Sequence, residues 1–179
     1  MPAVPVPLAQ RLLPLTVALA GSAAFAVGGR ARPDDGAAAL WLTDRRGDSA
    51  AVVATGDSIR AAFGRADVTA AMAYHHPRVV KAFNVADSVL DGREVVAANL
   101  RATLARVQLA FVENRVERLL VEGDMAVELT RFAIRGTPRR AGDGAPFVFR
   151  GRTMVVYVRS PASPTGWASI RELIQPVTD

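Results

Sequence analysis

Two neighbouring histidines near the middle of the chain are clear candidates for acid–base chemistry or ligand binding. His75 and His76 are its only histidines, and Pro77 follows them directly. Because imidazole titrates near neutral pH, either ring could move a proton or hold a ligand by a hydrogen bond. The alternative is structural: one ring serves as a cation at a helix end and the other packs in the core. His76 is the candidate acid or base, and His75 a candidate ligand-binding residue.

Glu172 is the carboxylate best suited to acid–base chemistry, because it lies in an apolar run that has the pattern of a strand, residues 166–174. Strand alternation puts Glu172 on the face of Ile174 and Arg171 on the opposite face. Burial on an apolar face raises the pKa of a carboxyl group and suits it to proton transfer. The alternative is an ion pair with an arginine of the neighbouring strand. Glu172 is therefore a catalytic candidate and Arg171 a ligand-binding candidate.

Three apolar or aromatic side chains complete the candidate binding site. Tyr157 and Phe132 fall in the middle of strand-like runs, and Met72 lies in a short helical stretch before the histidines. The simpler alternative for such residues is packing in the core. We expect no metal site, because adjacent histidines point in different directions and no carboxylate neighbours them. No phosphate-binding loop, dinucleotide fingerprint or nucleophile elbow occurs, so we expect no cofactor.

The amino-acid composition indicates a globular protein. Half of the 179 residues are apolar, which predicts one globular domain with a real core. The net charge is +5, but the basic pairs lie among glycine, aspartate and proline, and no run of five basic residues exists. We therefore expect a solvated basic surface and no nucleic-acid partner. The absence of cysteine excludes disulfides, thiolate metal sites, a cysteine nucleophile and a lipoprotein anchor.

The N-terminal region has the features of an export signal. Arg11 is the only charge before the uncharged stretch 12–29, and Ala24-Phe25-Ala26 has the form of a signal peptidase site. We predict a signal peptide over residues 1–26, a flexible tether over 27–48, and one domain over 49–179. The protein would then be periplasmic or secreted in a bacterium. The alternative is an uncleaved segment that anchors it in the membrane.

The remaining elements follow from periodicity and turn residues. A first helix is predicted to begin with Ser49 as its cap, a short second helix ends before Pro77, and an extended run covers 78–84. Asp91-Gly92-Arg93-Glu94 has the form of a capping box and predicts a third helix. Four strands follow, and Gly123-Asp124 suits a two-residue hairpin between the first two. The four strands are predicted over residues 112–122, 125–136, 146–159 and 166–174.

Three of these stretches carry a resemblance to a known superfamily: Gly64-Arg65-Ala66-Asp67, then residues 90–94, and residues 166–172. From about Ser49 to Gln175 the chain resembles nuclear transport factor 2-like proteins, in particular the branch of SnoaL-like polyketide cyclases and ketosteroid isomerase-like domains. The resemblance implies an α+β fold of conical shape, in which a curved antiparallel sheet wraps around three N-terminal helices and a pocket.

The resemblance leaves several functions open, because the superfamily includes isomerases, dehydratases, epoxide hydrolases and non-catalytic modules. Isomerase-like members place a general-base carboxylate in the extended segment after helix two, but residues 78–84 contain none. Our leading hypothesis is an exported domain that binds a small apolar molecule, as a homodimer formed through the exposed sheet face. One alternative is a cofactor-free lyase, isomerase or hydrolase that uses Glu172 and a histidine. Another is a non-catalytic dimerisation module whose pocket is filled by its own side chains.

Overall fold

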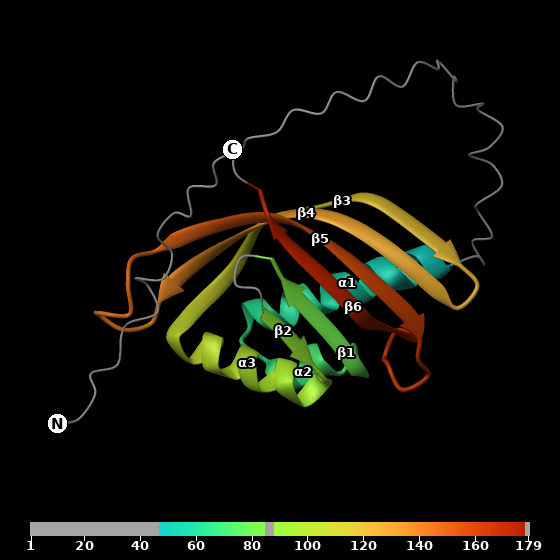
Figure 1. Cartoon of the computed structure of the whole chain (residues 1–179), viewed down its shortest axis with the longest axis horizontal. Helices are drawn as coiled ribbons and strands as arrows, with labels where there is room; N and C mark the ends of the chain where they lie inside the picture. The colour runs from blue at the N-terminus through green and yellow to red at the C-terminus, as the bar shows by residue number, and fades with distance from the viewer. Residues whose placement is uncertain (1–46, 85–87, 178–179) are drawn as a thin grey trace, which may run out of the picture.

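The computed structural model describes residues 47–84 and 88–177, so the predicted signal peptide and nearly all of the predicted tether lie outside the described residues. These described residues form three helices and six strands (Figure 1). They are α1 (Asp48–Gly64), α2 (Val68–Met72), β1 (His75–Phe83), β2 (Ser88–Asp91), α3 (Arg93–Arg106), β3 (Val107–Glu122), β4 (Met125–Pro138), β5 (Phe147–Arg159) and β6 (Trp167–Pro176). Within the described ranges, no helix has the length and apolar character needed to cross a membrane.

All six strands belong to one sheet, in the order β2-β1-β6-β5-β4-β3. The predicted meander is confirmed: β3 to β6 pair antiparallel in succession, and Gly123-Asp124 forms the turn between β3 and β4. The sheet as a whole is mixed and not antiparallel throughout, because β1 runs parallel to β6. The last strand returns to the first one after a long connection, and local patterns do not encode that pairing.

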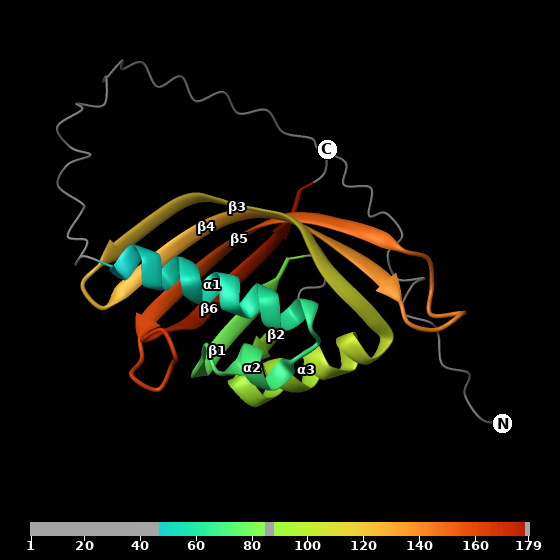
Figure 2. The ribbon, with the colours of Figure 1, turned by 180° about the vertical axis from the view of Figure 1, so that it is seen from behind.

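The sheet is strongly curved, and the helices lie on its concave side (Figures 1 and 2). α1 packs against β3, whereas α3 packs against β1 and against α2. One core cluster joins α2, α3 and β1 around Val79 and Leu104, and a second joins α1 to β5 and β6 around Val52 and Trp167. The space between these two clusters is where a site can form.

Two helices begin without the predicted side-chain caps. The cap position of α1 is Gly47, with φ of 101°, and Ser49 lies inside the helix. Asp91 belongs to β2, where it pairs with Val80, and α3 follows Gly92, whose φ is 92° and which makes no side-chain cap bond. The capping-box prediction is therefore wrong, because strand pairing holds the residue that would have capped the helix.

Candidate functional site

A cavity of about 290 Å³ lies between the helices and the concave face of the sheet. Phenylalanine dominates its walls: six of the seven phenylalanines of the chain line it. They come from α1 and four strands, and they are Phe63, Phe83, Phe111, Phe132, Phe147 and Phe149. Four of the rings follow one another at centroid distances of 6.4, 6.4 and 5.7 Å. Such a wall suits flat apolar ligands.

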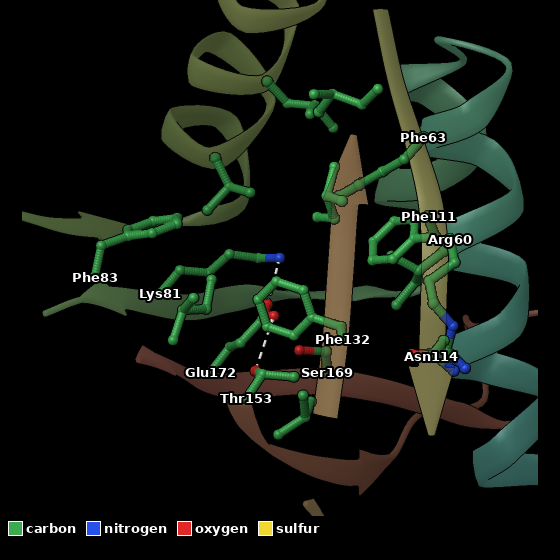
Figure 3. A pocket seen from close by; sticks show the side chains of 18 of the residues that line it. Arg60, Phe63, Lys81, Phe83, Phe111, Asn114, Phe132, Thr153, Ser169 and Glu172 are labelled. Atoms are coloured by element: carbon green, nitrogen blue, oxygen red, sulfur yellow. Dashed lines mark hydrogen bonds and ion pairs between the residues drawn. The ribbon is translucent and has the colours of Figure 1, made fainter. Parts of the chain in front are cut away.

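A buried ion pair projects into this apolar space (Figure 3). Lys81 Nζ lies 2.5 Å from Glu172 Oε2, and the Thr153 hydroxyl donates to Glu172 Oε1 at 3.2 Å. Lys81 is only 6% exposed, and its ammonium also lies 5.8 Å from the centroid of the Phe63 ring. Burial has the largest single effect and would raise the pKa of Glu172, but Lys81, His75 and Thr153 together outweigh it and hold that pKa below its ordinary value. Glu172 is therefore ionised at neutral pH.

A second carboxyl group lines the cavity nearer to α1. Glu128 is 1% exposed, and the Thr130 hydroxyl donates to its Oε1 at 2.7 Å. Arg60 Nη1 is 3.9 Å from the same oxygen, a distance too long for a hydrogen bond. Oε2 is buried without a hydrogen-bond partner among the described residues. Burial raises the pKa of Glu128, whereas the pKa of Glu172 is lowered. The pKa values of the two carboxyl groups of the cavity are therefore shifted in opposite directions.

Arg60 is held in place from two sides at this end of the cavity. Its Nη2 donates to Asp57 at 2.7 Å. In the amide orientation that satisfies both groups, the Asn114 side-chain oxygen accepts from Arg60 Nε at 3.1 Å and from Nη2 at 3.2 Å. Figure 3 shows Arg60 and Asn114 together at the edge of the cavity, away from Lys81. The guanidinium charge is thus compensated mainly by Asp57, not by Glu128.

Tyr157 places its hydroxyl close to α1, where a glycine makes room for it. A Cβ atom at Gly56 would lie 3.2 Å from the Tyr157 hydroxyl oxygen and 3.1 Å from Arg60 Nη1. Burial raises the pKa of Tyr157 well above its usual range, so the hydroxyl stays protonated. Its partner across β5 and β6 is Ser169, whose buried hydroxyl has no hydrogen-bond partner in the described part of the chain.

The strand register explains why these groups meet. Glu128 on β4 pairs with Val155 on β5, Val155 pairs with Glu172 on β6, and Glu172 pairs with Lys81 on β1. Residues that pair across strands point to the same face of a sheet. The three titratable groups therefore form one row across the concave face, with Val155 between the two carboxyl groups.

Of the residues singled out from the sequence, Glu172, Tyr157 and Phe132 line the cavity. His75 does not line it, although it is 2% exposed and close enough for Lys81 to affect its charge. Its Nδ1 is 2.8 Å from the carbonyl oxygen of Ala71, and its Nε2 is buried without a partner among the described residues. Burial, and to a smaller extent Lys81, lowers the pKa of His75 to about 3.

The other three predicted site residues lie outside the cavity lining. His76 accepts a hydrogen bond from the backbone of Arg78 at 3.1 Å, and Arg171 is exposed and donates to the Arg78 carbonyl at 3.0 Å. Met72 is buried in the cluster of α2 and α3. Strand alternation had placed Arg171 and Glu172 on opposite faces, and only the face of Glu172 is concave.

The sequence interpretation also missed groups that the fold brings to the cavity. The ion-pair partner of Glu172 is Lys81, not an arginine of the neighbouring strand. Two sequence signals could have found it: Lys81 is the only lysine among 22 basic residues, and it shares strand parity with Val79 and Phe83. Glu128 was open to the same argument, because it lies in an apolar strand. No local signal marks Arg60, since amphipathic helices commonly carry arginine.

Solved structures with the same architecture decide the fold. A conserved protein from Planctomyces limnophilus matches 74% of this chain and all of its own, with a TM-score of 0.65 and 22% identity. A ketosteroid isomerase-like protein from Erwinia carotovora atroseptica matches 75% of this chain and 99% of its own, at 0.62 and 16%. A nuclear transport factor 2-like superfamily protein from Salmonella enterica serovar Typhimurium matches 73% and 92%, at 0.61 and 15%. The chain has the nuclear transport factor 2-like fold.

Similarity to known proteins establishes the fold of this chain and not its chemistry. No protein-family model and no curated protein sequence matches the chain. At such low identities, the nuclear transport factor 2-like fold carries many functions, so the chemistry must be argued from the cavity itself. Across residues 47–84 and 88–177, no group of three or more histidine, aspartate or glutamate side chains could hold a metal ion.

Proposed function

We propose that this domain is exported and binds a small, largely apolar molecule in the phenylalanine-lined cavity. The observation that carries the proposal is the cavity of about 290 Å³ whose walls include six phenylalanines. Its volume is near the lower end of the range of about 300–1,000 Å³ that ligand pockets occupy. A ligand with one or two rings fits this space, and the few polar groups can orient it.

The charges inside the cavity favour a neutral ligand. Lys81 is paired with Glu172, and Arg60 is paired with Asp57. The remaining carboxyl group, Glu128, is buried, which raises its pKa. A charged ligand would have to compete with an existing pair or remain without a counter-ion in an apolar space, and both cost free energy.

The proposal is tested by blocking the mouth of the cavity from α3. Thr103 lines the cavity but is exposed, so Thr103→Trp fills the entrance without entering the core. Ala102→Trp is the matched control, because Ala102 is exposed on the same helix and does not line the cavity. A library of neutral aromatic compounds should raise the melting temperature of the wild type and of Ala102→Trp, but not of Thr103→Trp. Equal responses from all three proteins would contradict the assignment of this cavity.

A second candidate function, a cofactor-free lyase, isomerase or hydrolase, is favoured by one observation. Glu172 has a lowered pKa and Glu128 a raised one within the same cavity, which is the relation expected of a base and an acid. His75 and His76 do not line the cavity, so the second group would be Glu128 and not a histidine. In an enzyme of this kind, Glu128→Gln would abolish turnover of a bound substrate while leaving its binding intact.

We also propose that the domain forms a homodimer through the convex face of the sheet. Met125, Met154 and Leu173 are exposed there by 53%, 46% and 41%. The ion pair of Arg152 with Glu117 lies beside them, so the patch carries both charges and can complement itself across a two-fold axis. Light scattering should give the mass of a dimer for the wild type and of a monomer for Met154→Asp. A monomeric wild type would refute this proposal.

A further inference from the structure

The position of the single lysine is unusual for this chain. Twenty-two residues are lysine or arginine, and Lys81 is the only lysine among them. The other 21 are arginine. The one exception lies in the cavity, 6% exposed and surrounded by aromatic side chains. Lysine differs from arginine in that its amine can lose a proton and then act as a nucleophile.

Lys81 has a carboxylate in contact with its amine, and it lines the cavity. Its Nζ is 2.5 Å from Glu172 Oε2, so an acceptor for the ammonium proton is already in contact. Thr153 holds the other oxygen of the same carboxylate at 3.2 Å, which fixes its orientation. Figure 3 shows the lysine side chain extending from β1 toward the open centre of the cavity.

We propose that Lys81 forms an imine with an aldehyde or ketone that enters the cavity, an inference that rests on the proposed binding function. The ligand class is a small aromatic or otherwise apolar carbonyl compound. The phenylalanine walls bind its apolar body, and the amine of Lys81 reacts with its carbonyl carbon.

The step balances without any other reagent. Glu172 takes one proton from the ammonium group, and the lone pair of Lys81 Nζ then attacks the carbonyl carbon, so that a C–N bond forms and the carbonyl π bond opens. Proton transfers through Glu172 convert the oxygen into water, which leaves as the C=N bond forms. The product is a protonated imine and one water molecule. Its positive charge equals that of the original ammonium, so Glu172 keeps a counter-ion throughout.

Reductive trapping tests the proposal on the full-length protein. Cinnamaldehyde is added at pH 7 with sodium cyanoborohydride, which reduces an imine to a stable secondary amine, and the labelled position is read by peptide mass mapping. The only other primary amine is the α-amino group of the chain, which serves as an internal reference. Without help from the cavity this α-amino group reacts faster, since its pKa of about 7.7–8.0 lies well below the value of about 10.4 for an ordinary lysine.

We expect labelling of Lys81 to exceed that of the α-amino group by about tenfold or more in the folded protein. In guanidinium chloride the preference should reverse. Lys81→Arg should leave only the α-amino label, and Glu172→Gln should slow labelling of Lys81 alone. If a variant does not fold, the ratio of the two labels in the wild type still decides the question.

Cinnamyl alcohol separates this proposal from the binding function, because it has the same skeleton without the carbonyl group. If the alcohol raises the melting temperature but the aldehyde labels only the α-amino group, imine formation is refuted and the binding function stands. If neither compound raises the melting temperature and Lys81 remains unlabelled, both proposals fail for this ligand class. Labelling of Lys81 that persists unchanged in Thr103→Trp would also contradict reaction inside the cavity.

Discussion

Lys81 and Glu172 face each other across β1 and β6, the strands that run parallel, and their side chains form an ion pair of 2.5 Å within the cavity. The strand pairing positions the two charges. Because their surroundings are apolar, each charge is stabilised mainly by the other. A buried charge that loses its partner is costly, whereas a buried pair replaced as a whole by neutral groups can be tolerated.

Single and double substitutions of this pair should therefore have unequal effects. Glu172→Gln and Lys81→Met should each lower the free energy of unfolding by about 3 kcal/mol at pH 7, because each leaves an unpaired buried charge. The double variant should lie closer to the wild type than either single variant does. Denaturant titration measures all four proteins. Arg152→Gln is the control, since it breaks an exposed pair with Glu117 and should leave the stability nearly unchanged.

The contribution of Glu172 to the free energy of unfolding should also depend on pH in a defined direction. The pKa of Glu172 in the folded protein is below its ordinary value of 4.5. The unfolded state therefore binds more protons in this range, and the stabilisation is complete above pH 4.5 and declines as the pH falls through the lower folded value. The difference in unfolding free energy between the wild type and Glu172→Gln should shrink below pH 4.5. A difference that stayed constant down to pH 3 would contradict the lowered pKa.

His75 should make the protein less stable in mild acid. Its folded pKa is about 3 and its ordinary value is 6.5, so the unfolded state takes up a proton between these values and the folded state does not. The unfolding free energy should fall by up to about 1.4 kcal/mol for each pH unit below 6.5. Measured between pH 7 and pH 5, this decline should be much weaker in His75→Asn. His76→Asn should weaken the decline less than His75→Asn does, because burial and the nearby Arg78 also lower the pKa of His76, but that ring is only partly buried.

Glu128 should show the opposite dependence. Burial raises its folded pKa, so its contribution is favourable below the unfolded value and is lost as the pH rises through the folded value. Glu128→Gln should therefore be more stable than the wild type at pH 8, by about 1 to 2 kcal/mol, and by less at pH 5. Glu122→Gln on the exposed side of β3 is the control for replacing a glutamate by glutamine in this sheet. A loss of stability in Glu128→Gln at pH 8 would mean that the interaction of the Glu128 carboxylate with Arg60 stabilises the fold.

Two glycines of α1 should respond differently to alanine. Alanine is the better helix former by about 1 kcal/mol, so Gly64→Ala, which meets open space, should be neutral or stabilising. Gly56→Ala places a methyl group within 3.2 Å of the Tyr157 hydroxyl and of the Arg60 guanidinium. Crowding of this kind costs about 1 to 3 kcal/mol, so a net loss of stability is expected there. Thermal denaturation of the two variants provides the comparison.

The sequence by itself determined the kinds of element and the two faces of each strand. Alternation separated Glu172 from Arg171, and it placed Tyr157 and Phe132 in the middle of strands. Gly123 marked the hairpin, because a residue with positive φ is required at its turn. These features depend on neighbours within a few residues, which is the range over which a sequence pattern carries information.

Only the tertiary structure decided which faces and which strands meet. The pairing of Lys81 with Glu172 joins strands from opposite ends of the domain, and no local pattern records it. The separate pairing of β1 with β2 changed the role of Asp91, which became a strand residue instead of a helix cap. The structure also leaves both His75 and His76 outside the cavity lining, although His75 is buried. Strand alternation places adjacent residues on opposite faces of the sheet. Which of the two faces is concave is decided by the helices that cover the sheet.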